Sequence, residues 1–317
     1  MDNDRLEAVI QAVVRELEAA MVPAPPKAAP AGAAPANAPV PMVAPARKQA
    51  TAPAEGELRI DLADPTPLEA RGRSGIPHPV DAEGLAALME CTTSRIGVGR
   101  TGPCLRTAPL HLFMSDLAVT KDALARDVDP RLLADLGLFS VRTKVEGGKE
   151  EYLIRPDLGR QLSQDARTLI AERCIKGPDV QICVGDGLSA QAVETNLRKI
   201  LPVLQAGCAT AGLKLGTLFF IQYCRVGVMN DLGDLLQPKV LILLIGERPG
   251  LGRADSLSAY MAYRPKAGDT DAERDVICNI FDGGGVNPLE AGAYALRLAQ
   301  KMLTKQASGV KLKLMEE

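Results

Sequence analysis

Histidine and cysteine, which often serve as nucleophiles, bases or metal ligands, form no coherent site in this sequence. Among 317 residues there are only two histidines, His78 and His111, and they lie far apart in the chain. Their small number excludes a multi-histidine metal site and leaves few candidates for a serine–histidine triad. The seven cysteines are scattered without a CxxC pair, which indicates reduced thiols in a cytosolic protein. We expect His111 to pack in the core and His78 to lie in a surface turn.

Three loops are the best candidates for a binding site, because each follows a predicted strand. They span Gly185–Ser189, Gln222–Val226 and Gly246–Gly252. In open α/β sheets, ligands bind outside the carboxyl ends of the strands. Glycines there let a backbone approach a bulky ligand, and Glu247 offers acceptor oxygens to amide or hydroxyl donors. The same glycines could merely end strands, and Glu247 could pair with Arg248, so both interpretations stay open.

A GxGxxG pattern at Gly97–Gly102 does not predict a dinucleotide site. It follows no convincing strand and is succeeded at once by Pro103, whereas the fingerprint needs a strand before it and a helix after it. Three arginines surround it and form a cationic loop, namely Arg95, Arg100 and Arg106. Binding of a phosphate or carboxylate and contact with an acidic partner explain this loop equally well.

A second glycine cluster, Gly283–Gly285, precedes a well-marked helix. Asn287, Pro288 and Glu290 suit the N-cap, first and third positions of that helix. Its N-terminus would favour an anion, although a flexible hinge explains the glycines as well. Cys278, on the approach to this cluster, is by itself typical of an ordinary buried thiol.

The elements that must position these loops alternate between strand and helix in the C-terminal half. A helix with an apolar face starts at a Ser189 cap and ends at Gly212. The apolar runs predict four strands, at residues Val180–Val184, Leu213–Ile221, Val240–Ile245 and Leu257–Tyr263. The run at Val240–Ile245 is continuously apolar, as expected for a strand buried on both faces. This order predicts a Rossmann-like α/β domain with a mostly parallel sheet, over residues 166–317.

The N-terminal half has a different organisation. Apolar residues at helical spacing predict an amphipathic helix over residues 1–21, and residues 22–56 form an Ala/Pro-rich linker that leaves this helix tethered. Residues 57–165 are predicted to be mainly helical, with apolar-periodic stretches near 81–91, 109–125 and 129–136.

Within residues 57–165 we also expect a β-hairpin. β-prone runs at Phe139–Val141 and Tyr152–Ile154 flank Gly147–Gly148, whose freedom to adopt positive φ suits a tight turn.

Composition narrows the function classes. The chain is 46% hydrophobic with a net charge of −2, which indicates a folded protein without a field that would attract nucleic acid. The acidic N-terminus and the absence of a bilayer-length apolar run predict neither export nor membrane insertion. Because no acid, base and nucleophile form a constellation, a binding module or accessory subunit is favoured over a free-standing enzyme.

Taken in order, several loop motifs resemble the small subunit of ethanolamine ammonia-lyase. The GERPGLG stretch is the most specific of them, and the resemblance runs from Thr92 to Gly309. The motifs are Asp157-Leu158-Gly159-Arg160, Asp186-Gly187-Leu188-Ser189, Tyr223-Cys224-Arg225-Val226, Gly246-Glu247-Arg248-Pro249-Gly250-Leu251-Gly252 and Ser256-Leu257-Ser258.

This resemblance implies a Rossmann-like subunit that pairs with a barrel-shaped large subunit and holds adenosylcobalamin between the two. Val226, Glu247 and Cys278 match the family's cobalamin-contacting residues. The implied reaction converts ethanolamine to acetaldehyde and ammonia, and substrate residues belong to the large subunit, so no catalytic residue and no metal ligand is assigned to this chain. The sequence contains no DxHxxG pattern, so cobalamin is expected to keep its own base on cobalt.

Further expectations concern partners and location. The region 57–165 is expected to contact the large subunit, and the tethered helix 1–21 is similar to tags that load such enzymes into bacterial microcompartments. We therefore expect a cytoplasmic protein inside a microcompartment, with no nucleic-acid or membrane partner. The alternatives are a non-catalytic scaffold or microcompartment-docking protein and, with less support, a nucleotide-dependent oxidoreductase.

Overall fold

The computed structural model describes residues 74–92 and 94–315. The tethered helix expected at residues 1–21 and the linker at 22–56 lie outside the described residues. The elements, in chain order, are α3 (Ala82–Glu90), β1 (Arg100–Thr101), β2 (Cys104–Leu105), α4 (Thr107–Ala125), α5 (Pro130–Asp135), β3 (Phe139–Arg142), α6 (Gly148–Ile154), η1 (Leu158–Arg160), α7 (Gln164–Arg173), β4 (Val180–Gly185), α8 (Ala190–Thr210), β5 (Phe219–Gln222), α9 (Val228–Leu236), β6 (Val240–Gly246), β7 (Leu257–Tyr263), η2 (Asp271–Glu273), β8 (Arg274–Ile280), α10 (Pro288–Lys305) and α11 (Gly309–Leu314).

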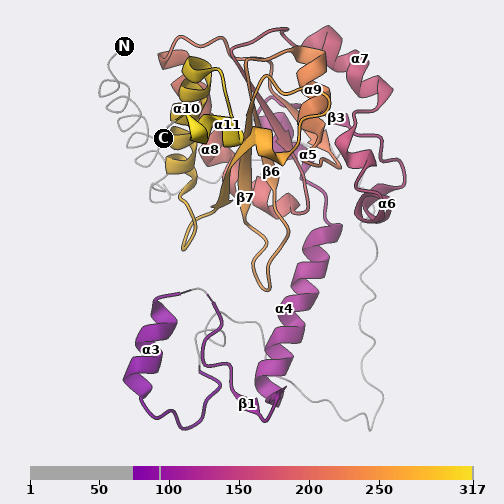
Figure 1. Ribbon diagram of the computed structural model, residues 1–317. Coiled ribbons are helices and arrows are strands. Elements are labelled where there is room, and N and C mark those ends of the chain that lie inside the picture. The colour runs from indigo at the N-terminus through magenta and orange to yellow at the C-terminus, as the bar shows by residue number, and fades with distance from the viewer. Residues whose placement is uncertain (1–73, 93, 316–317) are drawn as a thin grey trace, which may run out of the picture.

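The body is built on a six-stranded sheet with the order β3-β5-β4-β6-β7-β8 (Figure 1). The first four strands in that order are parallel, β7 is antiparallel to β6, and β8 is antiparallel to β7. Every residue of β4 and β6 is buried, because helices cover the centre of the sheet on both faces. This confirms the expected α/β domain with a mostly parallel sheet.

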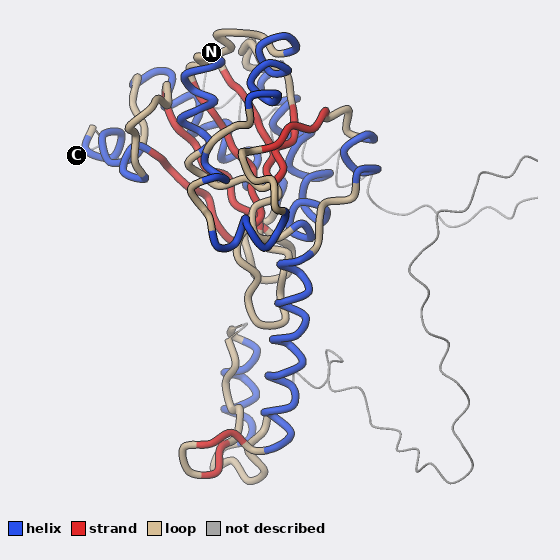
Figure 2. The backbone as a smooth tube through the Cα atoms, turned by 90° about the vertical axis from the view of Figure 1, so that its right-hand side faces the viewer, coloured by secondary structure: helices blue, strands red, loops and turns tan. Residues whose placement is uncertain are grey.

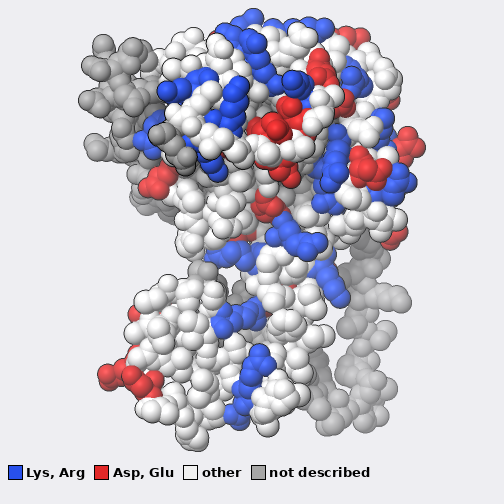
Figure 3. All heavy atoms as spheres, in the orientation of Figure 1, with Lys and Arg blue, Asp and Glu red and all other residues white. Residues whose placement is uncertain are grey.

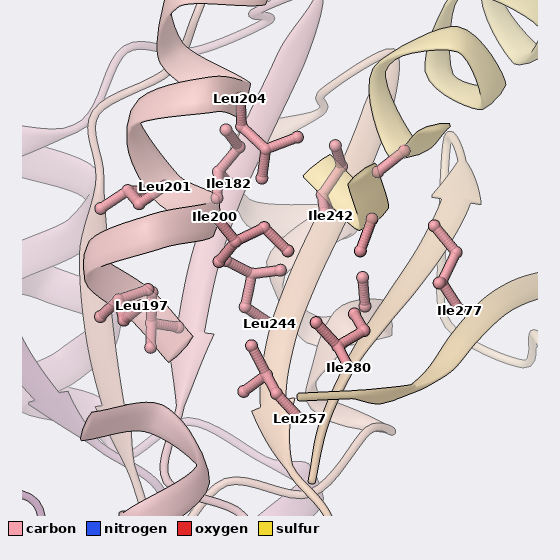
Figure 4. Packing of buried hydrophobic residues seen from close by; sticks show 14 of the residues in the cluster. Ile182, Leu197, Ile200, Leu201, Leu204, Ile242, Leu244, Leu257, Ile277 and Ile280 are labelled. Atoms are coloured by element: carbon pink, nitrogen blue, oxygen red, sulfur yellow. The ribbon is translucent and has the colours of Figure 1, made fainter. Parts of the chain in front are cut away.

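Two apolar layers enclose the sheet. On the first face, α8 and α10 pack against β4, β6, β7 and β8 in one continuous cluster, in which Leu197, Ile242 and Ile280 are fully buried (Figure 4). On the second face, α7 and α9 pack mainly against β3, β5, β4 and β6, and Ile170 and Met229 are fully buried there. The core is therefore one sheet between two unequal helical layers.

Local sequence signals account for where the two longest body helices begin and end. The Ser189 side chain accepts a hydrogen bond from the Ala192 N–H at 3.2 Å and caps α8, while Gly212 follows the helix at φ +66°. Asn287 caps α10 in the same way, with its Oδ1 2.8 Å from the Leu289 N, and Pro288 occupies the first turn. Both caps confirm the expectation from sequence.

A second structural unit projects from the body (Figures 1 and 2). We call residues 74–115 the arm, which contains α3, β1, β2 and the N-terminal half of α4. Helix α3 has no buried residue, and the only buried residues of the 19-residue α4 are Asp116 and Ala123. The three helices expected near residues 81–91, 109–125 and 129–136 are confirmed as α3, α4 and α5.

Two expectations about secondary structure are wrong. Gly148–Ile154 forms α6 and not the second strand of a hairpin, because Tyr152 buries its ring and hydrogen-bonds to the body, while β3 pairs in parallel with β5. The strand expected at Leu213–Ile221 is only Phe219–Gln222, since Leu215 makes just an isolated bridge to Val180.

Strand β8 was not predicted, because its alternation of polar and apolar residues is weak. The sheet also takes strands from both sides of the boundary expected at residue 166, since β3 forms its edge.

Candidate functional site

The carboxyl ends of β4 and β5 form the switch point of the sheet. The loop after β4 leads into α8 on the first face, and the loop after β5 leads into α9 on the second face. Adjacent strands whose loops diverge in this way leave a crevice that is the usual ligand site of doubly wound folds. Of the three candidate loops, Gly185–Ser189 and Gln222–Val226 lie at this crevice.

Residues of the chain itself fill the crevice. Asp186, at the end of β4, accepts hydrogen bonds from the backbone N–H groups of Tyr223 and Cys224 at 2.9 and 2.8 Å. The ammonium of Lys149 in α6 lies 3.2 Å from the same carboxylate. Burial raises the pKa of the Asp186 carboxyl, and Lys149 and the two N–H groups oppose that rise. This carboxylate is therefore used to join three segments of the body.

Tyr152 lies beside the same loop as these residues. Its hydroxyl donates to the Cys224 carbonyl at 2.7 Å, and the Arg225 guanidinium stacks 4.2 Å from the centre of its ring. Burial raises the pKa of Tyr152 above its usual range, so the hydroxyl stays a donor. Tyr152 and its partners thus pack against the loop that follows β5.

The glycines at the strand ends serve close backbone packing. A Cβ on Gly187, which has φ +57°, would lie 2.1 Å from the Gly246 carbonyl oxygen. A Cβ on Gly246 would lie 2.1 Å from the Ser189 carbonyl oxygen. Such distances are far below any allowed contact, so only glycine fits either position. The sequence left open whether these glycines admit a ligand or only end strands. Their close packing supports the second interpretation.

The three residues matched to cobalamin contacts gather around one tyrosine on the second face. The Tyr260 hydroxyl donates to Glu247 Oε1 at 3.2 Å, and Tyr260 pairs across β7 and β8 with Val276, two residues before Cys278. Val226 packs against the same apolar cluster as Tyr260 and lines the same groove. The structure thus brings Val226, Glu247 and Cys278 to one region, although they come from three different loops and strands.

Tyr260 is a site residue that sequence reasoning missed. Burial raises its pKa to about 12, and the neighbouring Glu247 carboxylate adds to the rise. At neutral pH the hydroxyl is therefore a proton donor that can hold one oxygen of Glu247 in place. The only signal in the sequence is a hydroxyl-bearing aromatic residue inside the otherwise apolar run of β7, which by itself does not reveal its partner.

A groove of about 810 Å³ opens beside Tyr260, between α9, η1 and η2. Arg225 and Arg274 line it, and the Nε atom of each is buried without a hydrogen-bond partner among the described residues. Arg274 is otherwise held by Asp271 and by Asn230 Oδ1, the latter at 2.9 Å. The groove therefore has two arginine side chains in its lining, next to Val226 and Tyr260.

The β8 end of the second face is open. Cys278 is exposed and Val276, which shares its side of the strand, keeps 49% of its surface exposed. The expectation that Cys278 is an ordinary buried thiol is wrong, because Ile277 and Ile280 take the buried positions of β8. His111 is also exposed and not packed in the core, since that side of α4 projects with the arm, while His78 lies in an exposed bend as expected.

The three arginines of the cationic loop do not form one site. The Arg95 guanidinium pairs with Asp116, whose side chain is fully buried, and its Nη2 also lies 3.4 Å from the Leu251 carbonyl oxygen. Arg100 donates to the Pro103 carbonyl at 2.8 Å, and Arg106 occupies the N-cap position of α4. The GxGxxG segment around them is part of the small β1–β2 hairpin in the arm, far from the switch point.

The described residues contain neither a metal-binding cluster nor a membrane-spanning helix. No group of three or more histidine, cysteine or acidic side chains among them is arranged to hold a metal ion. No described helix combines the length and the apolar character that a membrane crossing requires.

Comparison with known protein families gives a match over nearly all of the described body and most of the arm. The family model of the ethanolamine ammonia-lyase light chain (EutC) matches residues 82–313, from the first residue of α3 into α11. The match includes all six strands of the sheet and the region around Tyr260. A light chain is one subunit of a lyase and implies a larger partner subunit. The chain therefore belongs to the family of ethanolamine ammonia-lyase light chains.

Proposed function

We propose that this light chain binds adenosylcobalamin with the open part of its second sheet face, at the contact with the large subunit. The observation that carries the proposal is the cluster of Val226, Glu247 and Cys278 around Tyr260, next to strand residues that remain exposed. Family membership supports the same role, because ethanolamine ammonia-lyases depend on cobalamin. In this proposal the light chain binds and positions the cofactor and is not active alone.

The residues at this face suit the chemistry of the cofactor. The corrin ring carries amide side chains, and the second oxygen of Glu247 can accept a hydrogen bond from an amide while Tyr260 holds the first. Val226 and Val276 provide apolar surface for the ring edge. The guanidinium groups of Arg225 and Arg274, which line the neighbouring groove, suit the oxygen atoms of a polar tail.

In the reaction, the light chain contributes binding and orientation. When bound, adenosylcobalamin supplies the radical that begins the removal of ammonia from ethanolamine. Glu247 fixes the orientation of the cofactor, while Val226 and Cys278 exclude water from its edge. Because no histidine lies at this face among the described residues, we infer that cobalamin keeps its own base on cobalt. Spectroscopy that showed a protein imidazole on cobalt would contradict this inference.

We also propose that the arm contacts the large subunit. Its helices expose apolar side chains, including Leu88 at 58%, Leu110 at 42% and Met114 at 54%. Uncharged surface dominates the arm in Figure 3, and basic side chains gather toward its α4 side. A small unit with this much exposed apolar surface gains stability only when a partner covers it. A large subunit with an apolar groove and acidic rim is the partner that these features fit.

For residues 1–21 the support is the sequence pattern alone. We propose that they direct the enzyme into a bacterial microcompartment, by contact with shell or cargo proteins. Deletion of residues 1–21 should leave the activity of the assembled enzyme intact and abolish encapsulation. Normal encapsulation of the truncated protein would reject this role.

The first experiment is ammonia release from ethanolamine by this chain co-expressed with its large subunit. Activity should require both chains and added adenosylcobalamin. Glu247→Gln should raise the KM for adenosylcobalamin roughly 10- to 100-fold, the effect expected for loss of a hydrogen bond to a charged group. Arg248→Gln is the matched control, because Arg248 is the adjacent residue and is exposed. Equal KM values for both variants and the wild type would remove Glu247 from the site.

Inactivity of a soluble, correctly assembled complex would favour the scaffold alternative. That alternative predicts binding of the partner with the same affinity in the presence and absence of cobalamin.

A further inference from the structure

The loop that carries Glu247 bridges the sheet and the arm. We call residues 247–256 the Glu247 loop, which connects β6 to β7 and descends alongside α4 (Figure 1). Near the sheet the loop is fixed by α8: the Ser189 hydroxyl donates to the Ala254 carbonyl and Asn196 Nδ2 donates to the Asp255 carbonyl at 2.7 Å. These contacts hold the returning half of the loop but not its tip.

The tip is held by the helix that forms the arm. The Thr120 Oγ1 lies 2.9 Å from the Gly250 carbonyl oxygen and equally close to the carbonyl oxygen of Asp116, so one hydroxyl proton is shared between the loop and the helix. Arg95 Nη2 reaches the Leu251 carbonyl oxygen at 3.4 Å. Arg95 of the arm and Thr120, in the C-terminal half of α4, therefore contact two successive carbonyl groups at the tip of the loop.

A buried ion pair fixes the arginine. The Asp116 side chain has no exposed surface and pairs with Arg95, whose side chain is 35% exposed. Breaking an ion pair to a buried carboxylate costs free energy, so this pair restrains Arg95. Arg95 is thereby held where the same Nη2 also reaches the loop. We call Arg95, Asp116 and Thr120 the clasp.

The connection from the clasp to Glu247 is short and stiff. Only Arg248 and Pro249 separate Glu247 from Gly250, and Pro249 is buried with its φ fixed by its ring. The Glu247 N–H donates to the Ser256 carbonyl at 3.0 Å, so the start of the loop is tied to its end. A shift of Gly250 is therefore passed to Glu247 and is not absorbed by flexible residues.

We propose that the clasp is a set of positioning residues that holds Glu247 in the orientation required for cobalamin, and so links the arm to the cofactor face. This inference rests on the proposed function of Glu247. It assigns a role to Arg95 that is separate from those of Arg100 and Arg106. Because coupling between two sites is reciprocal, binding of the large subunit to the arm and binding of cobalamin then strengthen one another.

The test compares Thr120→Val with wild type in the assembled two-subunit enzyme. Valine keeps the shape of threonine and removes the hydroxyl. We expect the KM for adenosylcobalamin to rise roughly 2- to 10-fold, the range for one neutral hydrogen bond, with kcat unchanged at saturating cofactor. Hydrogen–deuterium exchange without cobalamin should be faster in peptides that cover residues 246–256.

Thr168→Val is the matched control. Its hydroxyl makes the same bond to the carbonyl four residues earlier, in α7, but touches no loop. This control should leave both the KM and the exchange of residues 246–256 at wild-type values. If Thr120→Val failed to assemble, Arg95→Lys would replace it, because lysine keeps the charge next to Asp116 and loses the fork that reaches Leu251.

The outcomes separate this inference from the proposed function. If wild type binds cobalamin and the clasp variants bind it equally well, the clasp does not position Glu247 and the inference is overturned. Failure of the wild-type complex to bind cobalamin would reject the proposed function itself, and the inference with it. A rise in KM together with faster exchange in the loop supports both.

Discussion

The two faces of the sheet are covered to different extents. On the first face, α8 and α10 extend over all strands from β4 to β8, and residues such as Leu244 and Ile280 are fully buried. On the second face, α7 and α9 bury the β3 side, whereas Val276 and Cys278 at the β8 end remain exposed. Helices thus cover the first face completely, whereas the β8 end of the second face is left uncovered.

The difference indicates where this fold offers room for a large ligand. The usual site, at the ends of β4 and β5, is occupied by Asp186, Lys149 and Tyr152. The open part of the second face is next to Glu247 and Tyr260, and a partner subunit can complete it. A flat cofactor between two proteins needs a face of this kind more than an internal crevice.

The largest expected effect is a loss of stability from a substitution on the fully covered first face. Leu244→Ala should lower the free energy of unfolding by about 2–5 kcal/mol, because it leaves a cavity in a fully buried cluster. Val276→Ala, on the open part of the other face, should cost about 1 kcal/mol or less. Urea denaturation followed by far-UV circular dichroism is suitable, since the chain has no tryptophan. Equal losses would show that the β8 end is packed in solution.

An intermediate loss of stability is expected where the loop after β4 packs against the end of β6. Gly187→Ala and Gly212→Ala both place a Cβ at positive φ, which costs about 1–2 kcal/mol. At Gly212 the space is empty within 4 Å, whereas at Gly187 the new atom would lie 2.1 Å from the Gly246 carbonyl oxygen. Gly187→Ala should therefore cost roughly 1–3 kcal/mol more, measured in the same denaturation experiment. Similar losses would mean that the loop after β4 can move away from β6.

The smallest effect concerns Tyr260 on the open face. Its pKa is raised to about 12, so its contribution to stability is complete below pH 10 and is lost as the pH rises toward 12. Glu247→Gln removes a neighbouring negative charge and should lower the pKa of Tyr260. Ultraviolet titration of each protein, after subtraction of its Tyr260→Phe counterpart, isolates this group. Glu290→Gln, a substitution at an exposed position, serves as control. An unchanged pKa of Tyr260 in Glu247→Gln would show that the two side chains do not interact in solution.

Much of the fold could be predicted from the sequence, because local signals are strong where burial is complete. The apolar run of β6, the Ser189 and Asn287 caps and Gly212 each specify an element through its own residues. The GERPGLG motif and its companions likewise identified the family, which comparison then confirmed. The hairpin was predicted wrongly, because Tyr152 is β-prone by type but is drawn into α6 by a contact with Cys224, a residue 72 positions away.

For the candidate site, too, some features could be predicted from the sequence and others could not. The sequence by itself determined the α/β order of elements and the family, and the family resemblance led to the proposal of Val226, Glu247 and Cys278 as cobalamin contacts. Only the tertiary structure decided that these positions surround Tyr260, that the switch point is filled and that Arg95 reaches the Glu247 loop. The physical reason is the range of the interactions: caps, turns and strand periodicity act between near neighbours, whereas cross-strand hydrogen bonds, ion pairs and open faces depend on which distant segments meet.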